Sequence, residues 1–215
     1  VDAASKTGVH AIKLQTYTPD TITIDHDKDE FFISDKENIW NGQTLYDLYK
    51  KAHTPWEWHD AIFKRAAKKG ITCFSTPFDE SAVDFLEKLN VPAYKIASFE
   101  NIHIPLIKKV ASTGKPIIIS TGMASIAELG ELVQTMVDCG NENFVLLKCT
   151  SNYPSSPDDS NVLTIPHMKN LFKCEVGLSD HTLGIGASIA AVAHGATVIE
   201  KHFTINRADG GVDSV

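Results

Sequence analysis

Lysine and hydroxyl side chains stand at the ends of several short apolar runs, where they could bind an anion. Lys13 and Gln15 alternate in AIKLQT (11–16), so they share one face of an expected strand, and Lys95 lies in AYKIAS (93–98). A buried cation without a partner is expensive, so two such lysines together suggest a site for a phosphate or a carboxylate. Further hydroxyl donors end neighbouring runs, namely Thr76, Ser98 and Ser120. The alternative is that each lysine reaches solvent or pairs with an acid.

Two histidines end consecutive β-rich runs, His181 in GLSDHT and His202 in EKHFT. Neutral imidazole is the commonest nitrogen ligand for divalent metals. Two histidines completed by waters or carboxylates suit a labile catalytic ion such as Mn or Mg better than a closed zinc site. The alternative is that both are packing or capping residues.

Four acids stand near these groups in the sequence. Glu200 shares the strand parity of His202 and could orient that imidazole from the outer shell of a metal site. The other three are Glu100, Asp180 and Asp213. Taken alone, each fits a solvated loop acid or a helix cap as well.

The elements that must position these residues alternate between short β-rich runs and helical stretches. Strands that alternate with helices predict a parallel sheet. The expected strands are 11–16, 72–77, 93–98, 116–121, 144–150, 175–180 and 198–204. The expected helices are 79–89, 104–113, 125–138 and 184–195, the third opening on a Ser125–Glu128 capping box.

Two parallel architectures fit this order, an open doubly wound sheet and a closed barrel. No GxGxxG or P-loop motif follows a strand, which disfavours a nucleotide-binding open sheet. Functional residues at many strand ends are typical of a barrel mouth. We therefore predict an α/β fold, a (β/α)8 TIM barrel that occupies 1–215 as a single domain.

The barrel is expected to be truncated. Seven strands are visible in 215 residues, where a full barrel needs eight and ~250 residues. Strand one would precede Val1, residues 1–8 would end its helix, and the final helix would be missing.

The long segment 17–55, which follows the first visible strand, interrupts the regular alternation of strands and helices. Loops of this length are usually functional or flexible. Its aromatic clusters suggest that it folds onto something, and NIWNGQTLYDLYKKA (38–52) predicts a turn followed by a short helix. The clusters are Phe31–Phe32, Trp40 and Tyr46–Tyr49.

Composition excludes several classes of function. With 43% hydrophobic and 22% charged residues the chain is ordinary globular protein, and a net charge of −7 argues against general nucleic-acid binding. No apolar run approaches the ~20 residues that span a bilayer. The four cysteines lie in apolar runs without CxxC or zinc-finger spacing, which fits reduced buried thiols and a cytoplasmic protein.

Six strings together resemble the sialic acid synthases, enzymes that join phosphoenolpyruvate to an N-acetylated amino sugar. They are STPFDE (75–80), YKIAS (94–98), STGM (120–123), LLKCTSNYP (146–154), GLSDHT (177–182) and EKHFT (200–204). Within that family, IWNGQTLYDLYKKAHTPWEWH (39–59) is most similar to pseudaminic acid synthases. N-acetylneuraminate and legionaminate synthases are the alternatives.

The resemblance implies a set of roles for the residues that match its motifs. The phosphoenolpyruvate contacts would be Lys13, Thr76, Lys95, Ser98, Ser120 and Ser179. His181 and His202 would bind a divalent metal, Mn or else Mg or Co. The sugar contacts would be Gln15, Glu100, Tyr153 and Asp213. Ser151 stands where the family usually has asparagine, so its contact to substrate is less certain, and Lys148 stands at a position that is often histidine.

The same resemblance implies features outside these residues. The family has an upstream catalytic glutamate and a C-terminal antifreeze-like domain, neither of which the chain contains, and it forms swapped homodimers. The favoured sugar is 2,4-diacetamido-2,4,6-trideoxy-altrose, which would give pseudaminic acid and phosphate. Two other functions stay open: a Schiff-base aldolase-type barrel that uses Lys13 or Lys95, and a non-catalytic sugar-binding barrel.

Overall fold

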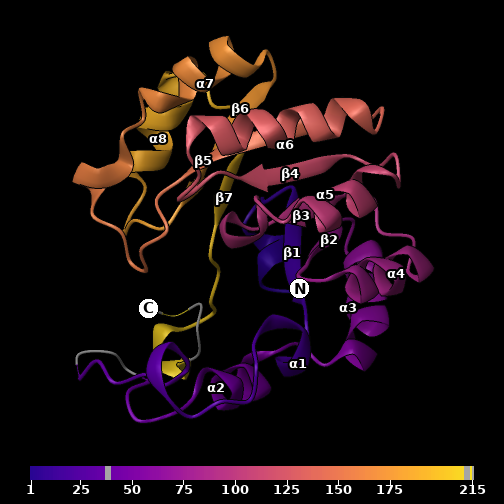
Figure 1. Ribbon diagram of the computed structural model, residues 1–215, viewed down its shortest axis with the longest axis vertical. Coiled ribbons are helices and arrows are strands. Elements are labelled where there is room, and N and C mark those ends of the chain that lie inside the picture. Colours follow the sequence, from indigo (N-terminus) through magenta and orange to yellow (C-terminus); the bar gives the residue numbers. More distant parts are fainter. Residues whose placement is uncertain (37–39, 211–213, 215) are drawn as a thin grey trace. The chain divides into compact units, whose positions relative to one another are not determined.

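The computed structural model describes residues 1–36, 40–210 and 214 (Figure 1). The chain forms two compact units, Val1–Val91 and Pro92–Val215, which we describe one at a time. Both units consist of parallel strands joined by helices, as the sequence predicts.

The first unit is built on two paired strands, β1 (Ala11–Thr16) and β2 (Thr72–Pro77). Ile12 and Leu14 pack against a small core formed by Ala66, Ile71 and Cys73. Because side chains alternate along a strand, Lys13 and Gln15 lie on the opposite face, as expected. The helices of this unit are α1 (Pro19–Ile22), α2 (Leu45–Ala52), α3 (Trp56–Lys68) and α4 (Glu80–Lys88), and its 3₁₀ turns are η1 (Ala4–Lys6) and η2 (Asp29–Phe31).

The 17–55 connection has secondary structure of its own. Its helix α2 follows a turn at Gly42 and begins at Thr44, whose hydroxyl accepts a hydrogen bond from Asp47 N, so the predicted turn and short helix are confirmed. Tyr17, only 3% exposed, packs edge-on against Tyr49 with 5.7 Å between the ring centroids. Tyr17 also packs edge-on against Phe78, directly after β2, with 5.3 Å between the ring centroids, and this contact holds the connection onto its own unit.

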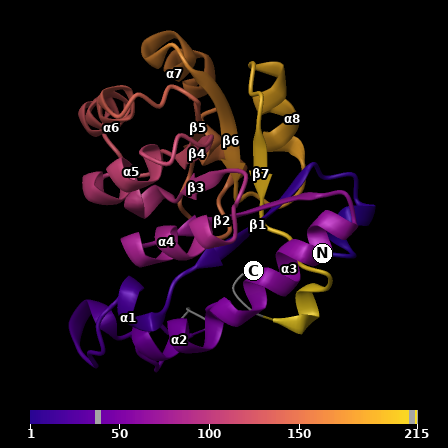
Figure 2. The same cartoon turned by 90° about the vertical axis from the view of Figure 1, so that its right-hand side faces the viewer.

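The second unit contains five parallel strands in sequence order, β3-β4-β5-β6-β7. They are β3 (Tyr94–Ile96), β4 (Ile117–Ser120), β5 (Phe144–Cys149), β6 (Glu175–Asp180) and β7 (Ile199–Lys201). The helices are α5 (Ile104–Ala111), α6 (Ile126–Asp138), α7 (Thr164–Phe172) and α8 (Gly186–Ala193). Figure 2 shows α5 and α6 packed side by side next to the strands.

Local sequence signals explain how these helices begin and how the strands approach. The predicted capping box is present at α6, where Ser125 Oγ accepts from Glu128 N and the Glu128 carboxylate accepts from Ser125 N. On β6, a side chain at Gly177 would collide with the carbonyl of Val198, which instead accepts a hydrogen bond from Leu178 N at 2.8 Å. Glycine at this position therefore allows the last strands to pair.

Some strands are shorter than predicted, and this changes where two site residues lie. Ser98 belongs to a 3₁₀ turn, η3 (Ser98–Glu100), and not to the end of β3. The carboxamide of Asn101 donates to the carbonyls of Ser120 and Gly122 and fastens this turn beside β4. His202 lies one residue beyond β7. The remaining 3₁₀ turns are η4 (Pro157–Ser160) and η5 (Arg207–Asp209).

Across the described residues, no helix has the length and apolar character needed to cross a membrane.

A buried histidine links three elements of the first unit. His59 on α3 is fully buried, and its Nε2 lies 2.8 Å from Thr16 Oγ1, which is 2.6 Å from Ser75 Oγ. Its Nδ1 lies 3.2 Å from the carbonyl of Pro55, which can only accept, so Nδ1 carries the proton and Nε2 accepts from Thr16. Burial lowers the pKa of His59, although hydrogen bonds to the Pro55 and Trp56 backbone oppose this effect.

We predict that this imidazole makes the stability of the protein pH-dependent. Because its pKa is lower in the folded than in the unfolded state, the unfolded state binds more protons, and stability is lost as the pH falls below about 6.5. Urea unfolding of the wild type and of His59→Gln at pH 7.5 and 5.5 measures the effect. The loss between the two pH values should be smaller in His59→Gln, and an equal loss in both proteins would contradict the prediction.

Candidate active site

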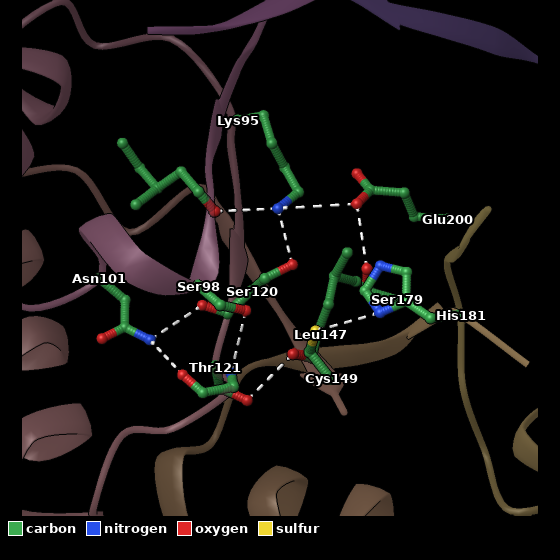
Figure 3. A network of polar contacts seen from close by, with 12 residues as sticks. Lys95, Ser98, Asn101, Ser120, Thr121, Leu147, Cys149, Ser179, His181 and Glu200 are labelled. Atoms are coloured by element: carbon green, nitrogen blue, oxygen red, sulfur yellow. Dashed lines mark hydrogen bonds and ion pairs between the residues drawn. The ribbon is translucent and has the colours of Figure 1, made fainter. Parts of the chain in front are cut away.

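Lys95 is the buried cation around which the polar groups of the second unit gather (Figure 3). Its side chain is 2% exposed, and Nζ donates to Ser120 Oγ at 2.6 Å and to the Ile96 carbonyl at 2.9 Å. Nζ also lies 3.7 Å from Glu200 Oε1. Lys95 is therefore buried and pairs with an acid near the end of another strand, while it also contacts a hydroxyl group that could help it to bind an anion.

The ion pair between Lys95 and Glu200 requires a curved sheet. Lys95 is on β3 and Glu200 on β7, four strand spacings apart in the ladder, or roughly 19 Å in a flat sheet. The two side chains together cannot span that distance. Strands β3–β7 therefore curl so that their inner faces meet, as a barrel wall requires.

Hydroxyl groups extend the network from the neighbouring strand ends. Ser179 Oγ on β6 donates to Glu200 Oε1 at 3.1 Å, and Ser98 Oγ accepts from Gly122 N at 3.2 Å. A Cβ at Gly122 would stand 2.8 Å from Ser98 Oγ and would collide with Ser151 Oγ, so glycine allows both serines to approach β4. Ser98, Ser120, Ser151 and Ser179 are thus brought into one region with Lys95.

Cys149, at the end of β5, lies within this region. Its Sγ is 3.6 Å from Ser151 Oγ and 3.9 Å from His181 Nδ1 (Figure 3). Burial alone would raise the pKa of Cys149, but hydrogen bonds with His181, Ser98 and Ser151 outweigh it and lower the pKa to about 7. The interpretation of this cysteine as an inert buried thiol therefore misses its polar surroundings.

The two histidines lie together, as predicted. The ring centroids of His181 and His202 are 5.2 Å apart, and the Tyr153 ring lies 4.3 Å from His181 and 5.6 Å from His202. Burial acts to lower the pKa of His181, but its contacts with Cys149 and the Thr150 carbonyl outweigh it and raise the pKa. Burial also raises the pKa of the Tyr153 hydroxyl to about 12.

This pair fits a divalent cation. His181 Nδ1 lies 2.8 Å from the Thr150 carbonyl, so Nδ1 donates there and Nε2 keeps its lone pair for a metal. Over the described residues no group of three or more His, Cys, Asp or Glu side chains is arranged to hold a metal ion. The histidines open onto a pocket of about 300 Å³ that is also lined by Tyr153 and Arg207.

Glu100 is the acid with the most altered environment. Burial raises its pKa to about 7, although the charge of Lys95 opposes this shift. Among the described residues, its buried Oε2 has no hydrogen-bond partner. A carboxyl group whose pKa lies near neutrality can both accept and donate a proton under working conditions.

Three further predicted site residues belong to the first unit. Lys13 and Gln15 lie on β1 and Thr76 on β2, with Gln15 opposite Thr76 in the ladder. Within the described chain the buried hydroxyl of Thr76 has no hydrogen-bond partner. Asp213 lies outside the described residues.

The profile of the NeuB family matches residues 1–215, the whole chain. The chain belongs to the NeuB family. It is 45% identical over 214 residues to a pseudaminic acid synthase of Campylobacter jejuni, covering 100% of this chain and 62% of that protein. It is 39% identical over 220 residues to an N,N'-diacetyllegionaminic acid synthase of Legionella pneumophila, covering 99% of this chain and 60% of that protein.

A solved structure extends the comparison to the fold. The crystal structure of an N-acetylneuraminic acid synthetase from Leptospira borgpetersenii, in complex with citrate, matches with a TM-score of 0.86 and 31% identity, covering 99% of this chain and 69% of that one. The barrel class predicted from the sequence is thereby confirmed. The chain spans less than two thirds of the length of the curated relatives reported above.

Sequence reasoning overlooked two features of this NeuB site. Glu200 was expected to orient His202, and the contacts of its carboxylate with Lys95 and Ser179 were not foreseen. Cys149 was set aside as a core thiol. The string LLKCTS, in which a thiol is followed by two hydroxyl residues at a strand end, was the signal that could have drawn attention to it.

We predict that Glu100→Gln stabilises this NeuB protein at alkaline pH. The folded state holds the Glu100 proton up to about pH 7 and the unfolded state only to about 4.5, so the wild type loses stability as the pH rises between these values. Allowing for partial exposure, the variant should gain ~1–3 kcal/mol at pH 8 relative to pH 5. Urea unfolding measures it, with the exposed Glu131→Gln as the matched control. A gain no larger than that of the control would contradict the prediction.

Proposed function

We propose that the protein containing this chain condenses phosphoenolpyruvate with an N-acetylated amino sugar and releases phosphate and a nonulosonic acid. The sugar that we favour is 2,4-diacetamido-2,4,6-trideoxy-altrose, which gives pseudaminic acid. The observation that best supports this choice is the 45% identity to a pseudaminic acid synthase, against 39% to a legionaminic acid synthase. Legionaminate and neuraminate synthesis are the second choice.

The anionic substrate would bind at the buried lysine. Lys95 already donates to Ser120, and Ser98 and Ser179 supply hydroxyl groups from adjacent segments. Charge-assisted hydrogen bonds of this kind are about twice as strong as neutral ones, so they can fix the carboxylate or phosphate of phosphoenolpyruvate. The motif match assigns the same role to Lys13 and Thr76.

His181 and His202 would hold the divalent cation, Mn or else Mg or Co, through their ring nitrogens. When bound, such an ion supplies a Lewis acid that polarises the aldehyde oxygen of the open-chain sugar. Tyr153, whose ring packs against both imidazoles, would help to position that sugar. The motif match adds Gln15 and Asp213 as sugar contacts and Ser151 as a substrate contact.

The residues would then position the reacting carbons. Lys95 and its hydroxyl neighbours hold phosphoenolpyruvate so that C3 bonds to the aldehyde carbon, whose oxygen takes up a proton. Water adds at C2 and loses a proton, and phosphate leaves with its bridging oxygen as C2 becomes a ketone. Glu100, with a pKa of about 7, is suited to exchange a proton with a hydroxyl group of the sugar.

The structure weighs against the Schiff-base alternative at Lys95. Imine formation needs an uncharged amine, whereas the ion pair with Glu200 favours the ammonium form of Lys95. Borohydride trapping with pyruvate would label Lys95 or Lys13 if that alternative were right. A non-catalytic sugar-binding barrel would bind phosphoenolpyruvate without releasing phosphate.

We also propose that the protein works in the cytoplasm as a homodimer. The four cysteines are all free thiols, which suits a reducing compartment. The dimer rests on the family resemblance.

We predict that activity requires a divalent cation. In the full-length protein, EDTA should abolish phosphate release, and Mn, Co or Mg should restore it, because His181 and His202 are placed to bind such an ion. His181→Ala should lose activity, whereas the exposed His167→Ala should keep it. Full activity of metal-free His181→Ala would refute the metal assignment.

The choice of sugar is tested by competition. With full-length protein and phosphoenolpyruvate, kcat/KM for 2,4-diacetamido-2,4,6-trideoxy-altrose should exceed that for N-acetylmannosamine by roughly 10–200-fold, the selectivity that one pocket methyl group supplies. Better turnover of N-acetylmannosamine would make the protein a neuraminate synthase. Binding without phosphate release for either sugar would support the non-catalytic alternative.

A further inference from the structure

A second ion pair is formed by Asp180 and Lys201, the residues that immediately precede the two histidines in the sequence. Strands β6 and β7 end with Asp180 opposite Lys201, and the residue that follows each strand is one of the histidines, His181 or His202. Asp180 Oδ2 lies 2.9 Å from Lys201 Nζ. The pair therefore joins the two backbones at the positions from which the imidazoles project.

The carboxylate of Asp180 is fully enclosed and accepts from four donors. Oδ1 accepts from Thr182 N at 2.9 Å and from Thr182 Oγ1 at 2.7 Å, and Oδ2 accepts from Ser188 Oγ at 2.6 Å and from Lys201 Nζ. Lys201 Nζ in turn donates to the Thr182 carbonyl at 2.6 Å. His181, between Asp180 and Thr182, thus has both of its chain neighbours fixed by this network.

The ion pair is tied to helix α8 through Ser188, whose hydroxyl donates to Asp180. Asp180 and Lys201 also line the pocket onto which the two histidines open. Lys201 is not one of the two imidazoles, so a change there can alter their spacing without removing a histidine ligand.

We propose that Asp180 and Lys201 are positioning residues, whose ion pair holds His181 and His202 at the separation that a divalent cation requires. This inference rests on the proposed function, because it assumes that the two histidines bind the ion. Outer groups that orient metal ligands typically change metal affinity by 10–100-fold. The unequal exposure of the pair, 0% for the Asp180 side chain and 36% for Lys201, makes Lys201 the residue to replace.

The test measures Mn²⁺ binding to the full-length protein by titration calorimetry, together with the unfolding temperature. Lys201→Met keeps the apolar stem and removes the charge, and it should weaken Mn²⁺ binding at least tenfold. Lys201→Arg keeps the charge and should restore affinity to within about threefold of the wild type. Asp180→Asn, measured in parallel, should weaken binding in the same direction and covers the case in which Lys201→Met does not fold.

The matched control is Lys169→Met. It removes an exposed ion pair of the same length, Lys169 Nζ to Glu175 Oε2 at 2.9 Å, at the opposite end of β6. It should leave Mn²⁺ affinity unchanged, even if the unfolding temperature falls.

The outcomes distinguish a failure of the proposed metal site from a failure of the positioning role of Asp180 and Lys201. If the wild type and His181→Ala bind Mn²⁺ equally, the proposed metal site is wrong, and the positioning role falls with it. If His181→Ala loses binding while folded Lys201→Met and Asp180→Asn both bind like the wild type, the metal site stands and the positioning role is overturned. A lower unfolding temperature with unchanged affinity likewise makes the pair structural only.

Discussion

The second unit depends on how it accommodates one buried charge. An ammonium group that is 2% exposed must find partners, since leaving it unpaired would cost several kcal/mol. Lys95 finds them in the Ser120 hydroxyl, the Ile96 carbonyl and the Glu200 carboxylate. Because Glu200 comes from β7 and Lys95 from β3, the same interaction that neutralises the charge also requires the sheet to curl. The pairing of this buried charge and the curvature of strands β3–β7 therefore depend on each other.

The sequence predicted well those features that are determined by residues close to one another along the chain. The alternation of strands and helices, the opposite faces of Leu14 and Lys13, and the capping box at Ser125 follow from residue types within a few positions of one another. The histidine pair was predictable for a related reason, because parallel strands bring their carboxyl ends to one edge. In these cases the backbone geometry alone places the side chain.

The contacts that the sequence did not reveal need curvature or an irregular turn. Glu200 follows Lys95 by more than a hundred residues, and only a curled sheet brings them together, so strand parity alone did not reveal this ion pair. Ser98 was placed on a strand, yet Asn101 draws the chain into a 3₁₀ turn by donating to two carbonyls beside β4. Neither the Lys95–Glu200 contact nor the turn at Ser98 produces a periodic pattern in the sequence. The family motifs contain Lys95, Ser98 and Glu200, but they do not show how these side chains contact one another.

Each unit keeps a buried polar atom without a hydrogen-bond partner among the described residues near a strand end, Thr76 Oγ1 in the first and Glu100 Oε2 in the second. Lys95 and Glu200 are 3.7 Å apart, longer than the 2.7–2.9 Å of a strong charge-assisted hydrogen bond. A substrate anion that came within 2.7–2.9 Å of Lys95 Nζ would therefore interact with this lysine more strongly than Glu200 does. Glu100 Oε2 and Thr76 Oγ1, buried without a partner in the described chain, each carry a desolvation cost of about 1–3 kcal/mol. Within the second unit, an anion offers acceptors for Lys95 and a sugar hydroxyl offers a donor for Glu100, so binding would recover part of the energy that folding leaves unused there.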